Sequence, residues 1–150
     1  MPNKHHTETI DSKLKAAWQA VSRMYNTEAS LHEGTMAMAH FLLNVDSHEG
    51  SFASDIAPAL GMESTSLSRI ISSLEDKKLI LRKNDKIDKR KILITLTKKG
   101  KEQKELAKNI VRNFNQLAEI KIGKDKVQSF FTTIDEIISL AEDRNKSLKK

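Results

Sequence analysis

The sequence contains no cysteine, only two prolines, and just 5% aromatic residues. Without cysteine, a disulfide scaffold, a zinc site built on thiolates and a thiol redox switch are all excluded. No apolar run approaches the roughly 20 residues that a bilayer-spanning helix needs, and the N-terminus lacks the apolar stretch of a secretory signal. These absences predict a cytoplasmic protein whose core consists mainly of Leu, Ile, Val and Met.

Positive charge is concentrated in one segment. The window from Lys77 to Lys91 holds eight basic and two acidic residues, so its net charge of +6 equals that of all 150 residues. The rest of the chain is therefore neutral. A cationic cluster on an otherwise neutral chain indicates contact with a polyanion, although a lysine-rich solvated turn would have the same composition. The segments on either side decide between these interpretations.

Apolar spacing predicts a mostly helical (α+β) chain with one β-hairpin. Residues recur at helical spacing in six segments and form strand-like runs in two. The predicted helices cover about 10–25, 36–50, 54–60, 64–77, 98–120 and 124 onward, and the predicted strands cover 79–82 and 92–96. A short helix, a turn, a second helix and a hairpin follow one another in the order of a winged helix-turn-helix.

Several boundaries have a chemical reason. Thr35 and Thr97 are predicted N-caps, because a hydroxyl can accept from the free N–H groups of a first helical turn. Gly50 is predicted to end the second helix and Gly61 to turn the chain after the third. Pro58 is expected in the first turn of its helix, where a missing N–H has little cost.

The helix predicted at 64–77 has an unusual polar face. Its apolar stripe consists of Leu67, Ile70, Ile71 and Leu74, and the remaining face is rich in serine. An ordinary solvent-facing helix would carry Glu, Lys and Gln, which are better helix formers. Short hydroxyls allow close approach to a duplex, and Arg69 can make a bidentate contact with guanine. We expect the DNA-facing residues of this helix to be Ser64, Thr65, Ser66, Ser68, Arg69 and Ser72.

The hairpin contains the triplet Asp88-Lys89-Arg90. An arginine at a hairpin tip can enter a narrow minor groove, where the potential is most negative. A carboxylate two positions earlier could orient the guanidinium by a charge-assisted hydrogen bond. Taken alone, the pair is better explained as an ordinary surface contact. The hairpin residues expected to contact DNA are Arg82, Lys83, Lys86, Asp88, Lys89, Arg90 and Lys91.

These motifs resemble the MarR family of bacterial transcription regulators. The resemblance covers about 11–140 and is strongest over 55–100, where the matching pieces are Asp55-Ile56-Ala57, Leu60-Gly61, Ser66-Leu67-Ser68-Arg69-Ile70, Leu74-Glu75, Leu79-Ile80, Asp88-Lys89-Arg90 and Leu96-Thr97-Lys98-Lys99-Gly100. Lys78 departs from the pattern, because the family commonly has glycine there, a residue that tolerates a left-handed helix end.

The resemblance implies a single MarR-type domain over 1–150. Residues 34–100 would form the DNA-binding lobe, and 8–30 and 101–146 the helices of a homodimer. A dimer would present two recognition helices to a pseudo-palindromic operator in double-stranded DNA. The expected function is that of a repressor released by a small, frequently phenolic, effector. No cofactor and no catalytic residue is expected.

Residues that could line an effector pocket are Trp18, Tyr25, Met36, Met38, His40 and Phe41. The same Met and aromatic stripe is also typical of an ordinary core. Five histidines leave a metal-responsive regulator as an alternative, although His32 and His40 lie eight residues apart and no tight ligand pair stands out. A winged helix used only for protein contacts is another alternative, but it does not account for the concentrated charge. No phosphate loop, HExxH or nucleophile elbow suggests an enzyme.

Overall fold

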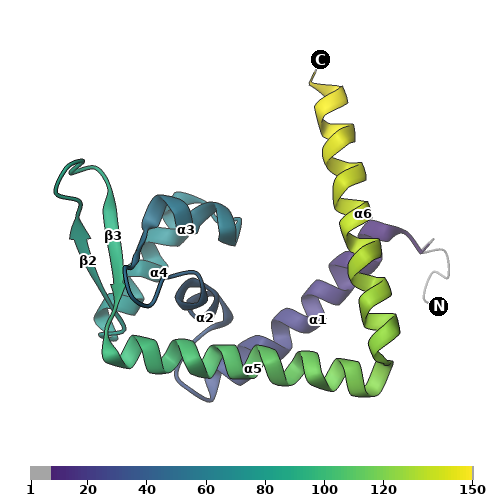
Figure 1. Cartoon of the computed structure of the whole chain (residues 1–150), viewed down its shortest axis with the longest axis horizontal. Coiled ribbons are helices and arrows are strands. Elements are labelled where there is room, and N and C mark those ends of the chain that lie inside the picture. The colour runs from purple at the N-terminus through teal and green to yellow at the C-terminus, as the bar shows by residue number, and fades with distance from the viewer. Residues whose placement is uncertain (1–7, 150) are drawn as a thin grey trace, which may run out of the picture. The chain divides into compact units, whose positions relative to one another are not determined.

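A computed structural model describes residues 8–149, which form two compact units, 8–108 and 109–149. Over the described residues there are six helices and three strands (Figure 1). Their bounds are α1 Ile10–Ser30, α2 Met36–Leu43, β1 Ser51–Phe52, α3 Ala53–Leu60, α4 Ser64–Asp76, β2 Ile80–Asn84, β3 Ile92–Leu96, α5 Lys98–Ile122 and α6 Lys124–Leu148. Between residues 8 and 149, no helix is both long and apolar enough to cross a membrane.

The first unit has the winged-helix arrangement that the sequence predicts. Helices α2, α3 and α4 group beside a small antiparallel sheet, and the β2–β3 hairpin projects beyond them (Figure 1). The mostly helical fold class is confirmed, with one addition. Strand β1 pairs with β3, Ser51 opposite Ile94 and Phe52 opposite Leu93, so the sheet has three strands in the order β1-β3-β2. A strand of two residues is too short to show an alternating pattern.

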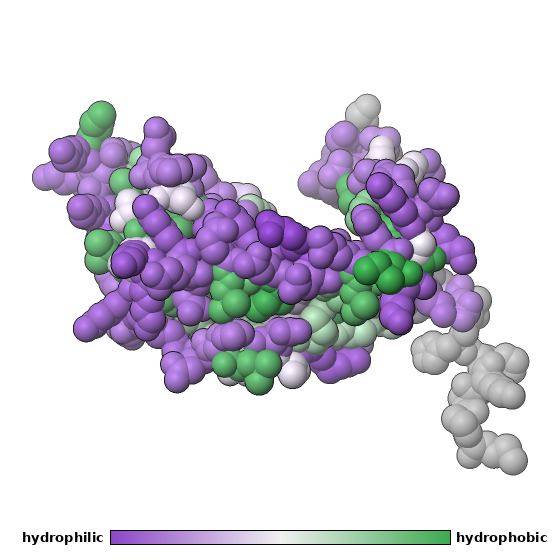
Figure 2. Space-filling model, turned by 60° about the horizontal axis from the view of Figure 1, so that its bottom comes forward, coloured by the Kyte–Doolittle hydropathy of each residue, from purple (hydrophilic) through white to green (hydrophobic). Residues whose placement is uncertain are grey.

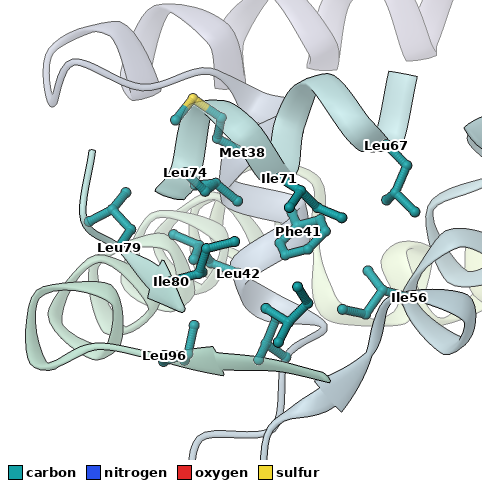
Figure 3. Packing of buried hydrophobic residues seen from close by; sticks show 12 residues of the cluster. Met38, Phe41, Leu42, Ile56, Leu67, Ile71, Leu74, Leu79, Ile80 and Leu96 are labelled. Atoms are coloured by element: carbon teal, nitrogen blue, oxygen red, sulfur yellow. The ribbon is translucent and has the colours of Figure 1, made fainter. Parts of the chain in front are cut away.

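The core of this unit joins helices α2, α3 and α4 to the β2–β3 hairpin. Its fully buried side chains come from α2 and the residues just after it, from α3 and α4, and from both strands of the hairpin (Figure 3). Burial of each such side chain stabilises the fold by about 1.5–3 kcal/mol. The set with the lowest exposure is Phe41, Val45, Ile56, Leu74, Ile80 and Ile94. Because α4 and the hairpin share this core, they are held as one body.

Two predicted helix starts are confirmed. The Thr35 hydroxyl accepts from the Met38 N–H at 3.2 Å at the start of α2, and the Thr97 hydroxyl accepts from the Gly100 N–H at 3.0 Å at the start of α5. The Thr97 hydroxyl also donates to the Lys78 carbonyl at 2.8 Å, which ties the start of α5 to the end of α4. Gly100 itself lies against the backbone of Leu79, where a Cβ would collide with the carbonyl oxygen.

The predicted end of the second helix is wrong. Helix α2 stops at Leu43, not near Gly50, because Asp46 builds a separate turn: its Oδ1 accepts from the His48 and Glu49 N–H groups, both at 2.8 Å. These hydrogen bonds also lower the pKa of Asp46. Gly50 has φ +79° and lies against the Ile94 carbonyl, so it serves the β1–β3 contact rather than a helix end.

The prediction for Pro58 is also wrong. Helix α3 begins at Ala53, which places Pro58 as the sixth of eight residues, in the second turn. The ring removes one helical hydrogen bond there, and Gly61 ends the helix at φ +58° as predicted. Lys78 likewise has φ +58°, so the position that is commonly glycine in the family keeps the left-handed conformation with a side chain present.

The second unit contains the rest of α5 and all of α6. No residue of α6 is buried, although the helix has several large apolar side chains. The exposed ones in this unit are Leu117, Ile120, Ile122, Phe130, Phe131, Ile138, Leu140 and Leu148. So much apolar surface on one small unit indicates a site of association.

Candidate nucleic-acid interface

Helix α4 separates a buried apolar stripe from an exposed polar face. Leu67, Ile71 and Leu74 are buried in the core, because residues three and four apart lie on one side of a helix. The six residues expected to face DNA are all exposed, as the sequence predicts: Ser64, Thr65, Ser66, Ser68, Arg69 and Ser72. This face therefore has one guanidinium among short hydroxyls.

The start of α4 is open to an anion. The N-cap residue, Glu63, makes no side-chain hydrogen bond to the first turn, so the free N–H groups there have no side-chain cap, and the helix dipole favours negative charge at this end. Ser68 donates to the Ser64 carbonyl at 2.9 Å. Its hydroxyl oxygen can still accept a hydrogen bond from a partner.

Two aspartates shape the tip of the wing, the hairpin formed by β2 and β3. Asp85 Oδ2 accepts from the Ile87 N–H at 3.2 Å and from the Asp88 N–H at 2.9 Å. The backbone closes the same turn, with Asp85 N–H donating to the Lys91 carbonyl and Lys91 N–H donating to the Asp88 carbonyl, both at 2.8 Å. The Asp88 N–H is the main cause that lowers the pKa of Asp85. The tip is therefore a defined turn.

Asp88 orients the wing arginine, as the triplet suggests. Its Oδ1 accepts from the Arg90 N–H at 3.1 Å and from Arg90 Nε at 3.3 Å. The Arg90 side chain is nevertheless 93% exposed. A guanidinium held at Nε and otherwise free can still present its two terminal nitrogens to a partner.

Arg82 is engaged differently from the other hairpin cations. Its Nε lies 2.9 Å from a carboxylate oxygen of Glu75, near the end of α4, and both side chains are partly shielded. Register places Arg82 opposite Ile94, on the core side of the hairpin. The pair therefore connects helix α4 to the wing.

The wing lysines have two environments. All four lysines, Lys83, Lys86, Lys89 and Lys91, are exposed. Lys91 differs in that its Nζ lies 5.4 Å from the centre of the Phe52 ring, a cation–π contact with β1. The other three are free to meet phosphates. Lys91 is anchored to the sheet at the base of the turn.

The residues expected to line an effector pocket are only partly together. Tyr25 of α1 and His40 of α2 form an edge-to-face ring pair with centroids 6.4 Å apart. Burial raises the pKa of Tyr25 and lowers that of His40. Trp18 is exposed on α1 and Met36 half-buried, but Phe41 and Met38 are buried in the core, which matches the core interpretation for these two.

The histidines form no metal centre among residues 8–149, where no group of three His, Asp or Glu side chains could hold an ion. His5 and His6 lie outside the described residues.

Sequence reasoning missed a buried cation in α5. Lys104 is 7% exposed, and its ammonium donates to the Val45 carbonyl just beyond the end of α2. Burial lowers the pKa of Lys104. A cation suits this place because the last carbonyls of a helix lack partners and attract positive charge. Lys104 lies between Gly100 and Ala107, which are both buried. Because all three residues lie on one side of α5, their spacing could have predicted that Lys104 is buried.

Comparison with known proteins agrees with this geometry. Residues 35–92, from the start of α2 to the start of β3, match the sequence profile of the MarR family. The Staphylococcus aureus MepR–DNA complex superposes with a TM-score of 0.80 at 21% identity, covering 89% of this chain and 98% of MepR. A MarR protein from Peptoclostridium difficile gives 0.82 at 17% identity, covering 96% and 94%.

The chain thus matches the MarR family profile over residues 35–92, and the match ends at Ile92. Over α1, α5 and α6 the likeness to the solved structures is one of fold. PcaV of Streptomyces coelicolor, solved with its natural ligand, matches with a TM-score of 0.78 at 20% identity, covering 94% of this chain and 99% of PcaV. No curated protein sequence matches the chain.

Proposed function

We propose that this protein is a homodimeric, sequence-specific double-stranded DNA-binding regulator of transcription. The observation that carries the proposal is the pairing, in one packed body, of the hydroxyl-rich face of α4 with a wing arginine held by Asp88. The MepR–DNA complex supports it, because that protein shares this fold and is bound to DNA. The role is regulatory and not catalytic.

Each part of the lobe has a distinct task in this proposal. Ser64, Arg69 and their exposed neighbours on α4 read base edges and phosphates in the major groove. Arg90 enters the adjacent minor groove, where the narrow walls concentrate negative potential. Exposed Lys83, Lys86 and Lys89 attract phosphates without regard to sequence. Arg82 acts through its contact with Glu75 and sets the wing relative to α4.

The dimer follows from apolar surface that a single chain leaves exposed. On α1, Ile10, Leu14 and Trp18 are exposed, and α6 buries none of its residues. Covering these faces with a second copy removes apolar area from water. It also places two lobes for two half-sites roughly 34–36 Å apart, one turn of B-DNA.

The regulator acts as a repressor that a small effector releases from DNA. Trp18, Tyr25, Met36 and His40 are the proposed effector-facing set, whereas Phe41 belongs to the core. The Tyr25–His40 ring pair between α1 and α2 is its best-placed part, since an aromatic ligand could stack beside it. PcaV, which shares the fold and was solved with its natural ligand, supports this part of the proposal. Effector binding would favour a lobe spacing that no longer fits the operator.

The test is selection of bound sequences from random duplexes with the purified protein. We expect an enriched site made of two inverted halves, because a two-fold dimer imposes its symmetry on the operator. Light scattering of the same sample should give twice the chain mass of 17.0 kDa. A chain that enriches no sequence and binds no duplex at low salt would overturn the proposal.

A further inference from the structure

The tip of the wing bears an apolar side chain that folding does not require. Ile87 is 96% exposed, the highest value among the exposed large hydrophobic residues between positions 8 and 149. Figure 2 shows a hydrophobic group standing among hydrophilic residues at the end of the molecule that has the wing. An isoleucine in this environment gains nothing from burial in the free protein.

Turn chemistry does not explain this residue either. The turn is built by the carboxylates of Asp85 and Asp88 and by backbone hydrogen bonds, to which Ile87 contributes only its N–H. Residues favoured in such turns are Gly, Asn, Asp, Ser and Pro, and β-branched residues are typical of strands. Any of the polar residues would maintain the same backbone contacts.

Ile87 and Arg90 project from the same small turn. Asp85 accepts from the N–H of Ile87, and Asp88, joined to Asp85 by its own N–H, holds the Arg90 guanidinium. Ile87 and Arg90 are three residues apart in this turn, so a groove that receives Arg90 lies close to Ile87. In the minor groove, an apolar side chain meets deoxyribose walls and the base-pair floor.

The chemistry of that floor depends on the base pair. A·T and T·A pairs present only acceptors there, whereas a G·C pair adds the protruding N2 amino group of guanine. An isoleucine cannot accept a hydrogen bond from that amino group and would desolvate it. Proteins that bind the minor groove do insert Ile, Leu or Phe side chains at base steps.

We infer that Ile87 is a specificity-determining residue, whose side chain packs into the minor groove beside Arg90 and selects base pairs that lack the N2 amino group. The inference rests on the proposed DNA-binding function and refines it. Arg90 supplies affinity and the preference for a narrow groove, and Ile87 supplies discrimination against the amino group.

The test uses the duplex selected for the wild-type protein and two modified versions of it. At the pairs under the wing, 2,6-diaminopurine replaces adenine and adds the minor-groove amino group, or inosine replaces guanine and removes it. Neither change alters the major-groove pattern of hydrogen-bonding groups that α4 would read. We expect the added amino group to weaken wild-type binding roughly tenfold, the size of a single unfavourable base pair.

Ile87→Ala should bind the duplexes with and without the amino group almost equally, with an unchanged melting temperature because the side chain is exposed. Leu81→Ala is the matched control, since Leu81 is an exposed apolar residue on the same hairpin but away from the tip. It should keep the wild-type ratio. Arg90→Ala should bind both duplexes more weakly yet still bind the duplex without the amino group better. This variant therefore distinguishes a clash of the amino group with Ile87 from a change in groove width that Arg90 senses.

A wild-type ratio in Ile87→Ala would overturn the inference and leave the proposed function intact. Discrimination that disappears in Arg90→Ala while Ile87 is present would also overturn it, because Arg90 alone would then read the groove. Failure of the wild-type protein to bind any duplex would overturn the proposed function itself.

Discussion

The winged-helix lobe and helix α6 are both rich in Leu, Ile and Phe, but they use these residues in opposite ways. In the lobe, the apolar side chains of α2, α3, α4 and the hairpin converge on one buried cluster, and the outer surface is polar. In α6 no side chain is buried. Apolar spacing alone predicts a helix in both places. What the side chains pack against differs: the lobe's own elements in one case and, as we propose, a second copy of the chain in the other.

The largest effect is expected from placing charge on the exposed apolar surface of α6. We expect Phe130→Glu combined with Ile138→Glu to separate the dimer and lower operator affinity by roughly 10²–10⁴-fold, because two linked lobes gain that much over one. Sedimentation and binding titration measure the two effects. The control is Gln128→Glu, a charge added at an exposed polar position of the same helix. Intact dimers in the double variant would contradict the assignment of this surface.

A large-to-small change in the lobe should have the complementary effect. Leu74 is fully buried, so Leu74→Ala should lower the free energy of unfolding by about 2–5 kcal/mol through lost contacts and a cavity. Denaturant unfolding measures this loss. The matched change on α6, Leu140→Ala at an exposed position, should alter dimer stability and leave the unfolding of the lobe unchanged. An equal loss of lobe stability in both variants would mean that the two regions share one core.

The wing arginine affects binding rather than folding. Arg90→Ala should weaken operator binding by about 1–3 kcal/mol, and its thermal stability should match that of the wild type because the side chain is 93% exposed. Asp88→Asn should have a smaller effect in the same direction, since the guanidinium then loses its charged partner. Equal operator affinity in Arg90→Ala and wild type would exclude the wing from the contact.

The Glu75–Arg82 pair distinguishes a positioning role from a direct contact. Glu75→Gln should weaken binding by about 1 kcal/mol, within the range of a partly exposed ion pair, although Glu75 itself repels phosphates. If Arg82 met a phosphate directly, removing that carboxylate would instead strengthen binding. The exchange of both residues, Glu75→Arg with Arg82→Glu, should recover part of the loss, because the connection between α4 and β2 is restored.

The smallest expected effect is a pH dependence at His40. Burial lowers the pKa of His40 below 6.5, so the unfolded chain binds more protons than the folded one at and just below that pH. The stability that neutral His40 contributes should therefore be present above pH 6.5 and be lost as the pH falls below it. Asp46 and Asp85, with pKa values below 3.8, do not titrate in this window. Unfolding at several pH values should show this slope in wild type and a flatter one in His40→Gln.

Local chemistry made much of the lobe predictable. The stripe of Leu67, Ile71 and Leu74 determined which face of α4 is buried, and the hydroxyls of Thr35 and Thr97 marked two helix starts that the structure confirms. The triplet ending in Arg90 contained both partners of its own ion pair. In each case the interacting groups lie within a few residues of each other, so spacing was enough.

The missed features depend on contacts between distant segments. Strand β1 exists because Gly50 allows the chain to approach Ile94, and the buried place of Lys104 depends on the Val45 carbonyl 59 residues away. The Asp46 turn stopped α2 early by side-chain hydrogen bonds that an apolar pattern does not reveal. A role for Ile87 at the wing tip was not predicted, because a single apolar residue in a charged segment shows no helical or strand periodicity.

The most direct test is to titrate the selected duplex with purified protein at several salt concentrations. We expect affinity to fall with a log–log slope of about −0.9 for each phosphate neutralised, and the slope to become shallower by about one contact in Lys86→Ala, whose side chain lies exposed beside the wing tip. A salt-independent affinity, or no measurable binding at low salt, would contradict the proposal that the wing and α4 together bind a DNA duplex.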